Sequence, residues 1–207
     1  MDLIKLPECL KRIESVQEFR ASSSRPSTKK LADKPTRFGT ENMPNGNYLL
    51  IPKVSSERRH YIPVGFMTPE ILSSDLVFII PDATLYHFGV LTSIVHNAWM
   101  RVVCGRLKSD FRYSKDIVYN NFPWPEPTED QKTKIEQTAQ AILDARQIYP
   151  EASFADMYGN LILFPDLMKA HRANDLAVLE AYGFPKDASE SEIVARLFKM
   201  YQELAEN

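Results

Sequence analysis

Glycine is scarce in this chain, with seven residues in 207 and no clustered group among them. Phosphate-binding loops and dinucleotide cradles need closely spaced glycines before a helix, so the composition argues against such sites, including one for S-adenosylmethionine. Two cysteines, Cys9 and Cys104, and four scattered histidines predict free thiols in a reducing compartment and no zinc site. No apolar run approaches the roughly 18 residues that span a bilayer. The first residues also lack a signal peptide, so we expect a cytoplasmic protein without a metal or cofactor of its own.

The sequence offers few candidates for catalytic residues. Residues 116–124 resemble the strand and the Asn-Pro-Pro-aromatic loop of adenine-N6 methyltransferases. The similarity ends after Asn120, because Asn121 and Phe122 follow it and Pro123 comes late. We interpret this segment as a structural connector and predict that the chain itself is not an enzyme.

The charge of the chain is divided unevenly. Residues 1–125 contain 17 Lys and Arg against 12 Asp and Glu, a balance of +5, whereas residues 126–207 contain 8 against 15, a balance of −7. A charge run is most often only a solvated face. A basic part followed by an acidic part nevertheless predicts different partners for the two, with nucleic acid favoured for the first.

Proline and hydrophobic patterns divide the chain in the same place. Pro123, Pro125 and Pro127 exclude regular structure and predict a boundary between a domain of residues 1–125 and a helical domain of residues 126–207. Capping boxes at Thr128 and Ser189 predict two of the helices in the second domain. We expect an α+β fold, with a mixed α/β domain around a small, mainly antiparallel sheet and then a helical bundle. The elements predicted in the first domain are helices at 7–21 and 92–104, an irregular segment at 22–46, and strands at 48–54, 60–66 and 76–80, the last one central and buried on both faces.

The most informative stretch is a row of alternating polar residues. If residues 108–113 are extended, Lys108, Asp110 and Arg112 lie on one side, and Phe111 and Tyr113 face the other way as anchors. We call these three charged residues the polar row. Lys and Arg donate to guanine O6 and N7, and a carboxylate accepts from cytosine N4, so the row suits a DNA major groove. The alternative interpretation is a solvent-facing strand with cross-strand ion pairs.

Five collinear segments resemble one protein family. Together they resemble the C-terminal part of MmeI-like type II restriction-modification enzymes, from about Leu6 to Tyr182. In that family one polypeptide carries an endonuclease, an adenine-N6 DNA methyltransferase, a target-recognition domain and a helical tail. The resemblance implies a recognition fragment without the catalytic domains, so that S-adenosylmethionine belongs to the methyltransferase domain of the parent. The segments are residues 53–66, 80–91, 96–101, 105–114 and 118–125.

The resemblance also assigns roles to residues. It implies that Lys108, Asp110 and Arg112 contact bases, with Ser74 and Asp75 as weaker candidates for the same role. We expect basic side chains to hold phosphates without selecting sequence. His60, beside Arg58 and Arg59, is a further candidate for such a contact. The expected partners are double-stranded DNA and the methyltransferase domain of the parent. The alternative is a protein-interaction module whose acidic helical part docks another domain. The expected phosphate contacts are Arg25, Lys29, Lys30, Lys53, Arg58, Arg59 and Arg106.

Overall fold

The structure is a computed structural model that describes residues 6–39, 41 and 44–206. The chain divides into two compact units, an N-terminal unit of Met1–Met43 and a main unit of Pro44–Asn207. Each unit is described by itself.

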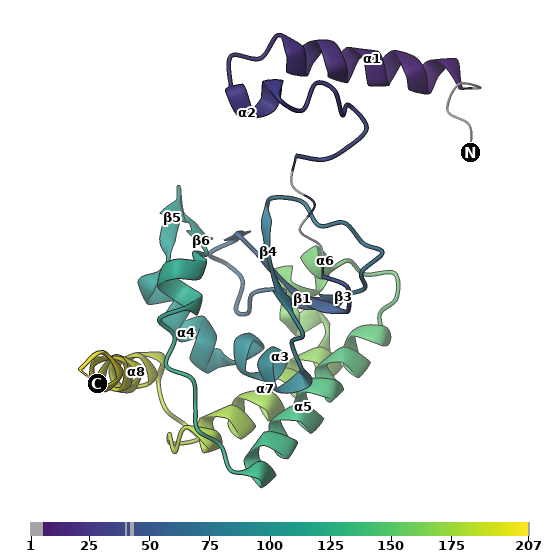
Figure 1. Cartoon of the computed structure of the whole chain (residues 1–207). Helices are drawn as coiled ribbons and strands as arrows, with labels where there is room; N and C mark the ends of the chain where they lie inside the picture. Colours follow the sequence, from purple (N-terminus) through teal and green to yellow (C-terminus); the bar gives the residue numbers. More distant parts are fainter. Residues whose placement is uncertain (1–5, 40, 42–43, 207) are drawn as a thin grey trace. The chain divides into compact units, whose positions relative to one another are not determined.

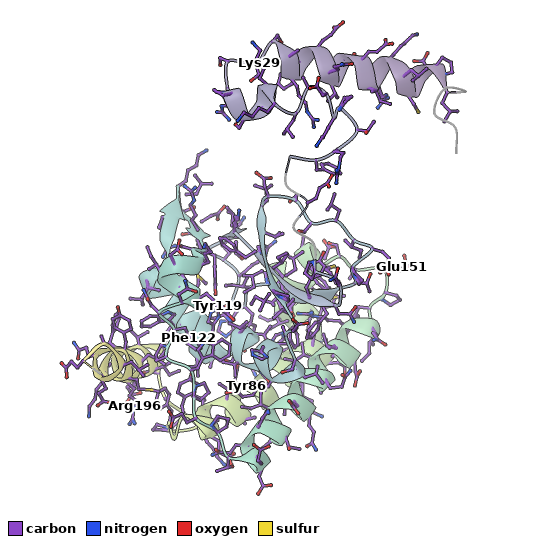
Figure 2. All side chains as sticks on the ribbon, in the orientation of Figure 1. Lys29, Tyr86, Tyr119, Phe122, Glu151 and Arg196 are labelled. Carbon is purple, nitrogen blue, oxygen red and sulfur yellow. The ribbon has the colours of Figure 1, made fainter. Side chains whose placement is uncertain are left out.

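The N-terminal unit is built on two helices. Helix α1 (Pro7–Ala21) and the short helix α2 (Pro26–Lys29) both begin with proline, whose fixed φ suits the first turn of a helix. The predicted helix at 7–21 is therefore confirmed. No residue of α1 is buried, and most of its side chains are exposed (Figure 2). The Arg20 guanidinium holds the following loop, because it donates to the carbonyl oxygens of Leu31 (3.1 Å), Lys34 (2.6 Å) and Arg37 (2.8 Å).

The main unit contains two small antiparallel sheets (Figure 1). In the first, β1 (Tyr48–Pro52) is central, between β3 (Gly65–Met67) and β4 (Val77–Pro81). The expectation that 76–80 forms a central, fully buried strand is wrong. Strand β4 lies at the edge, and its preceding residue Leu76 is 67% exposed. Burial on both faces therefore does not explain the apolar run of β4. One face of the strand packs on the core, and the other stays partly exposed.

The second sheet has the order β2-β6-β5, formed by Val54–Ser55, Asp110–Arg112 and Gly105–Leu107. The chain passes from one sheet to the other at Lys53. Its N–H donates to the Leu76 carbonyl (2.9 Å), and its carbonyl accepts from the Tyr113 N–H (2.8 Å). All strand pairs are antiparallel, so the predicted fold class is confirmed.

Helices cover the sheets and form the rest of the main unit. The helix predicted at 92–104 is present as α4 (Ile94–Val103), and a separate helix that was not predicted, α3 (Leu85–Thr92), comes directly before it. Ser93 between them is extended, and its hydroxyl accepts from the His96 N–H as a cap that starts a new helix. The capping boxes predicted at Thr128 and Ser189 are both present. The other elements are η2 (Lys115–Tyr119), α5 (Glu129–Gln147), α6 (Phe154–Gly159), η3 (Leu161–Leu163), α7 (Pro165–Ala181) and α8 (Glu190–Ala205).

One hydrophobic core joins the strands to all of the long helices of the main unit. It extends from Leu49 on β1 to Leu197 on α8. Helix α8 lies beside α4 (Figure 1), where Trp99 meets the rings of Phe198 and Tyr201 at centroid distances of 5.2 and 6.0 Å. The segments before and after Pro125 therefore share packing, and the boundary between residues 125 and 126 stays a prediction.

Candidate nucleic-acid interface

Strands β5 and β6 form a hairpin that projects from the main unit (Figure 1). Leu107 pairs with Asp110, so the turn consists of Lys108 and Ser109. Lys108 has a φ of 56°, in the left-handed region that lysine seldom adopts. The expectation that Lys108 continues one extended segment with Asp110 and Arg112 is therefore wrong, because the chain reverses direction at Lys108. Its side chain lies instead at the exposed tip of the hairpin.

The rest of the polar row keeps the predicted alternation. Asp110 and Arg112 share one face of β6, while Phe111 and Tyr113 are buried, at 5% and 4% exposure. Across the strands, Arg112 pairs with Gly105 and Val54, and neither offers a charge. Among the described residues, no ion pair involves any member of the row, so the alternative of a strand with cross-strand ion pairs is wrong.

A neighbouring turn holds Asp110 in place. The Asp110 Oδ1 accepts from the Glu57 backbone N–H at 3.3 Å. Glu57 lies in a turn closed by a bond from the Arg59 N–H to the Ser56 carbonyl (3.1 Å). One carboxylate oxygen of Asp110 is thereby fixed, and the other remains available to a ligand.

Arg106 lies on the opposite face from the polar row. Its guanidinium stacks over the Phe111 ring at 4.1 Å from the centroid and donates to the Ser109 carbonyl at 2.9 Å. The side chain therefore braces the turn of the hairpin. It lies on the face of the hairpin that carries Phe111, away from Asp110 and Arg112.

Lys53 brings a second predicted segment close to the point where the sheets meet. Its ammonium group donates to the Asp75 carbonyl and lies 4.8 Å from the centroid of the Phe78 ring. Ser74 accepts from the Leu76 N–H at 3.2 Å, which shapes the same loop. The structure thus brings Lys53, Ser74 and Asp75 together at one end of the first sheet.

The remaining basic candidates are dispersed. Arg25, Lys29 and Lys30 belong to the N-terminal unit, where Lys29 projects from α2 (Figure 2). Arg58 is exposed, whereas Arg59 is partly buried and its Nε has no hydrogen-bond partner among the described atoms.

A cleft of about 460 Å³ adds a residue that the sequence did not single out. Arg58 and His60 line it together with Arg172, which comes from α7 in the acidic half of the chain. The only sequence signal for Arg172 is its charge, because Arg58 and His60, which line the cleft with it, are more than 100 positions away in the sequence. The cleft can be found only from the fold.

The buried histidines have structural roles. His96 hydrogen-bonds the Tyr113 hydroxyl (3.0 Å), and His171 hydrogen-bonds the Tyr158 hydroxyl (2.8 Å). Burial lowers the pKa of His96 to about 4 and that of His171 to about 3, so both imidazoles are neutral near pH 7. Within the described ranges, no group of histidine, cysteine, aspartate and glutamate side chains could hold a metal. In the same ranges, no helix is long and apolar enough to cross a membrane.

Known proteins share this arrangement. The chain belongs to the family of MmeI target recognition domains, whose model matches residues 1–126, and the model of the MmeI C-terminal domain matches residues 127–207. The chain is 36% identical over 200 residues to DNA methyltransferase A of Bacillus subtilis (strain 168), a match that covers 97% of this chain and 23% of that protein. It is also similar to the solved structure of the Type IIL restriction-modification enzyme MmeI in complex with DNA. That match has a TM-score of 0.91 and 42% identity, and covers 100% of this chain and 28% of the other. The predicted family is confirmed, and the chain spans about a quarter of the length of these relatives.

Proposed function

We propose that this chain is the sequence-specific duplex DNA recognition module of an MmeI-like restriction-modification adenine-N6 methyltransferase. The observation that carries the proposal is the exposed face of β6. Asp110 and Arg112 present unpaired charges there, and the buried Phe111 ring fixes their strand. Membership of the target recognition family and the likeness to a structure solved with DNA support the same function.

The polar row offers complementary groups to a G·C pair. The free oxygen of Asp110 can accept from cytosine N4, and Arg112 carries a planar fork of donors suited to O6 and N7 of a neighbouring guanine. Lys108, at the tip of the hairpin, would donate to the guanine of the pair that Asp110 contacts. Each good contact is worth about 1–3 kcal/mol of discrimination. Ser74 and Asp75, in the loop held by Lys53, are the second group proposed to contact bases.

Basic side chains would fix the position of the module on the duplex. Arg58 is the strongest of the proposed phosphate contacts, because it follows Glu57, which holds Asp110. Lys53 and Arg106 also have internal partners, so their proposed phosphate contacts would have to use the donors that remain. The proposed set is completed by Arg25, Lys29, Lys30 and Arg59.

The catalytic chemistry belongs, in this proposal, to another part of the parent polypeptide. S-adenosylmethionine would bind the methyltransferase domain of the parent, which is also the proposed protein partner of this module. No two of the described glycines stand together in a loop before a helix, so the residues here do not fit a cradle for that cofactor. Residues 1–125 would form the recognition domain and residues 126–207 the helical domain that supports it.

A paired charge swap tests the role of the polar row. Lys108→Asp with Asp110→Lys should change the preferred base pair at one position of the site, because donor and acceptor exchange places. The measurement is selection from a randomised duplex library, followed by sequencing of the bound fraction. Lys115→Asp with Asp116→Lys is a matched control, since that exposed pair, 3.4 Å apart, lies outside the row. An unchanged preference in the first double variant would contradict the assignment.

The acidic charge of residues 126–207 favours a second candidate, a module that docks another protein domain. The two functions differ in their response to salt. DNA binding through phosphates makes log affinity fall steeply and linearly with log salt concentration. Binding to random duplex that is absent at 50 mM salt would favour the docking module.

A further inference from the structure

The cleft beside the hairpin brings cations from two distant parts of the chain together. Arg58 and His60, which follow strand β2, and Arg172 of α7 all line it. Burial lowers the pKa of His60, and the positive charges of Arg101 and Arg172 lower it further, while the negative charge of Glu190 opposes them. His60 is therefore neutral near pH 7 and can donate a hydrogen bond without adding charge.

The acidic groups near the cleft already have partners. Asp175, at its floor, accepts from the Tyr61 hydroxyl (2.5 Å) and from the Ile94 N–H (2.7 Å). Arg101, behind His60, pairs with Glu190 at 2.9 Å and donates to the His60 carbonyl. Among the described residues, no ion pair involves Arg58 or Arg172, so both guanidinium groups remain available to an anion.

The cleft is directly connected to the proposed base contacts. Asp110 is hydrogen-bonded to the backbone of Glu57, and Arg58 is the next residue. A DNA strand whose base faces Asp110 would therefore carry its sugar-phosphate backbone close to Arg58. From there the cleft leads across to α7.

We propose that Arg58 and Arg172, assisted by the imidazole N–H of His60, bind a backbone phosphate of the duplex at the mouth of this cleft. The proposal rests on the proposed DNA-recognition function. It gives the helical region a direct part in DNA binding despite the charge of −7 on residues 126–207. The local charge beside the phosphate decides the contact, since salt screens exposed charges beyond about 10 Å.

Arg172→Ala tests the contact on the whole 207-residue chain. Losing one phosphate contact should reduce the slope of log affinity against log salt by about 0.9. The deficit of the variant should therefore shrink about threefold between 50 and 200 mM salt. The preferred sequence should not change, because a phosphate contact carries no base information. Arg172→Lys, which keeps the charge, should restore most of the slope.

Lys169→Ala is the matched control. Lys169 is exposed on the same helix but lines a different groove, beside Asp144 and Asp166. It should leave both affinity and slope unchanged. If Arg172→Ala behaves like this control, or alters the preferred sequence, the phosphate contact is wrong.

A further variant separates this outcome from failure of the proposed function. Arg112→Ala should relax the base preference whether or not Arg172 contacts a phosphate. If Arg172→Ala leaves the salt slope unchanged while Arg112→Ala relaxes the base preference, only the phosphate contact in the cleft is overturned. Absence of salt-dependent duplex binding by the unaltered chain overturns both.

Discussion

Two glycines in the main unit have opposite surroundings. A Cβ on Gly89 of α3 would lie 2.6 Å from the Ile135 Cγ2 of α5 and 3.2 Å from the Ala139 Cβ. A Cβ on Gly105, at the start of β5, would meet nothing closer than the Arg112 carbonyl at 3.8 Å. The crossing of α3 and α5 has no room for a methyl group at Gly89, whereas the start of β5 has room for one at Gly105. The residues proposed to contact bases could therefore be substituted while the fold is held by the helices.

A buried polar network strengthens the crossing. Asn174 of α7 donates to the Gly89 carbonyl (2.8 Å), and its own carbonyl accepts from the Thr138 hydroxyl (3.1 Å). The three helices α3, α5 and α7 are thereby linked through one side chain. In the hairpin, Arg106 braces only the turn, through its bond to the Ser109 carbonyl.

Alanine substitution of each of the two glycines should give the largest difference in the free energy of unfolding. Gly89→Ala should lower the free energy of unfolding by about 3 kcal/mol, because backbone or side chains must shift to admit the methyl group. Gly105→Ala should change it by less than about 0.5 kcal/mol. Urea denaturation of both variants measures the difference. Equal effects would mean that the crossing is not the tightly packed part of the molecule.

The pH dependence of stability that arises from Asp175 should be nearly as large as the effect of Gly89→Ala. Burial raises the pKa of Asp175 to about 6, while its hydrogen bonds from Tyr61 and Ile94 oppose the shift. A raised carboxyl pKa means that the folded state binds the proton more tightly than the unfolded state. The stabilisation is therefore full below about pH 4 and is lost as the pH rises through about 6.

Asp175→Asn removes this titration. The advantage of the native chain over the variant should shrink by roughly 2–3 kcal/mol between pH 4 and pH 6.5. Denaturant unfolding of both chains across this range measures it. An advantage that grows with pH would show that the Asp175 carboxyl favours its ionised form in the folded state.

The features predicted correctly from the sequence depend on near neighbours. The capping boxes at Thr128 and Ser189 need residues only three positions apart, and the burial of Phe111 and Tyr113 follows from strand alternation. The family assignment rested on collinear segments and needed no geometry.

The features that were missed depend on distant contacts or unusual backbone. Nothing in its residue type marks Lys108 for the left-handed region, because lysine has no special preference for it. The change of sheet at Lys53 depends on Leu76 and Tyr113, and the cleft depends on the position of α7 beside Arg58. Such juxtapositions exist only once the chain has folded.

The two arginines on opposite faces of the hairpin allow the finest test of the comparison. Arg106→Ala removes the bond to the Ser109 carbonyl and the contact with the Phe111 ring, so stability should fall by about 1 kcal/mol. Arg112→Ala removes a side chain with no internal partner among the described residues and should change stability by less than about 0.5 kcal/mol. Hydrogen exchange of the amides of residues 105–112 measures the local effect. The sequence preference in DNA binding should show the opposite pattern, because Arg112→Ala should relax it and Arg106→Ala should preserve it. A loss of stability in Arg112→Ala would show that the exposed face also holds the hairpin together.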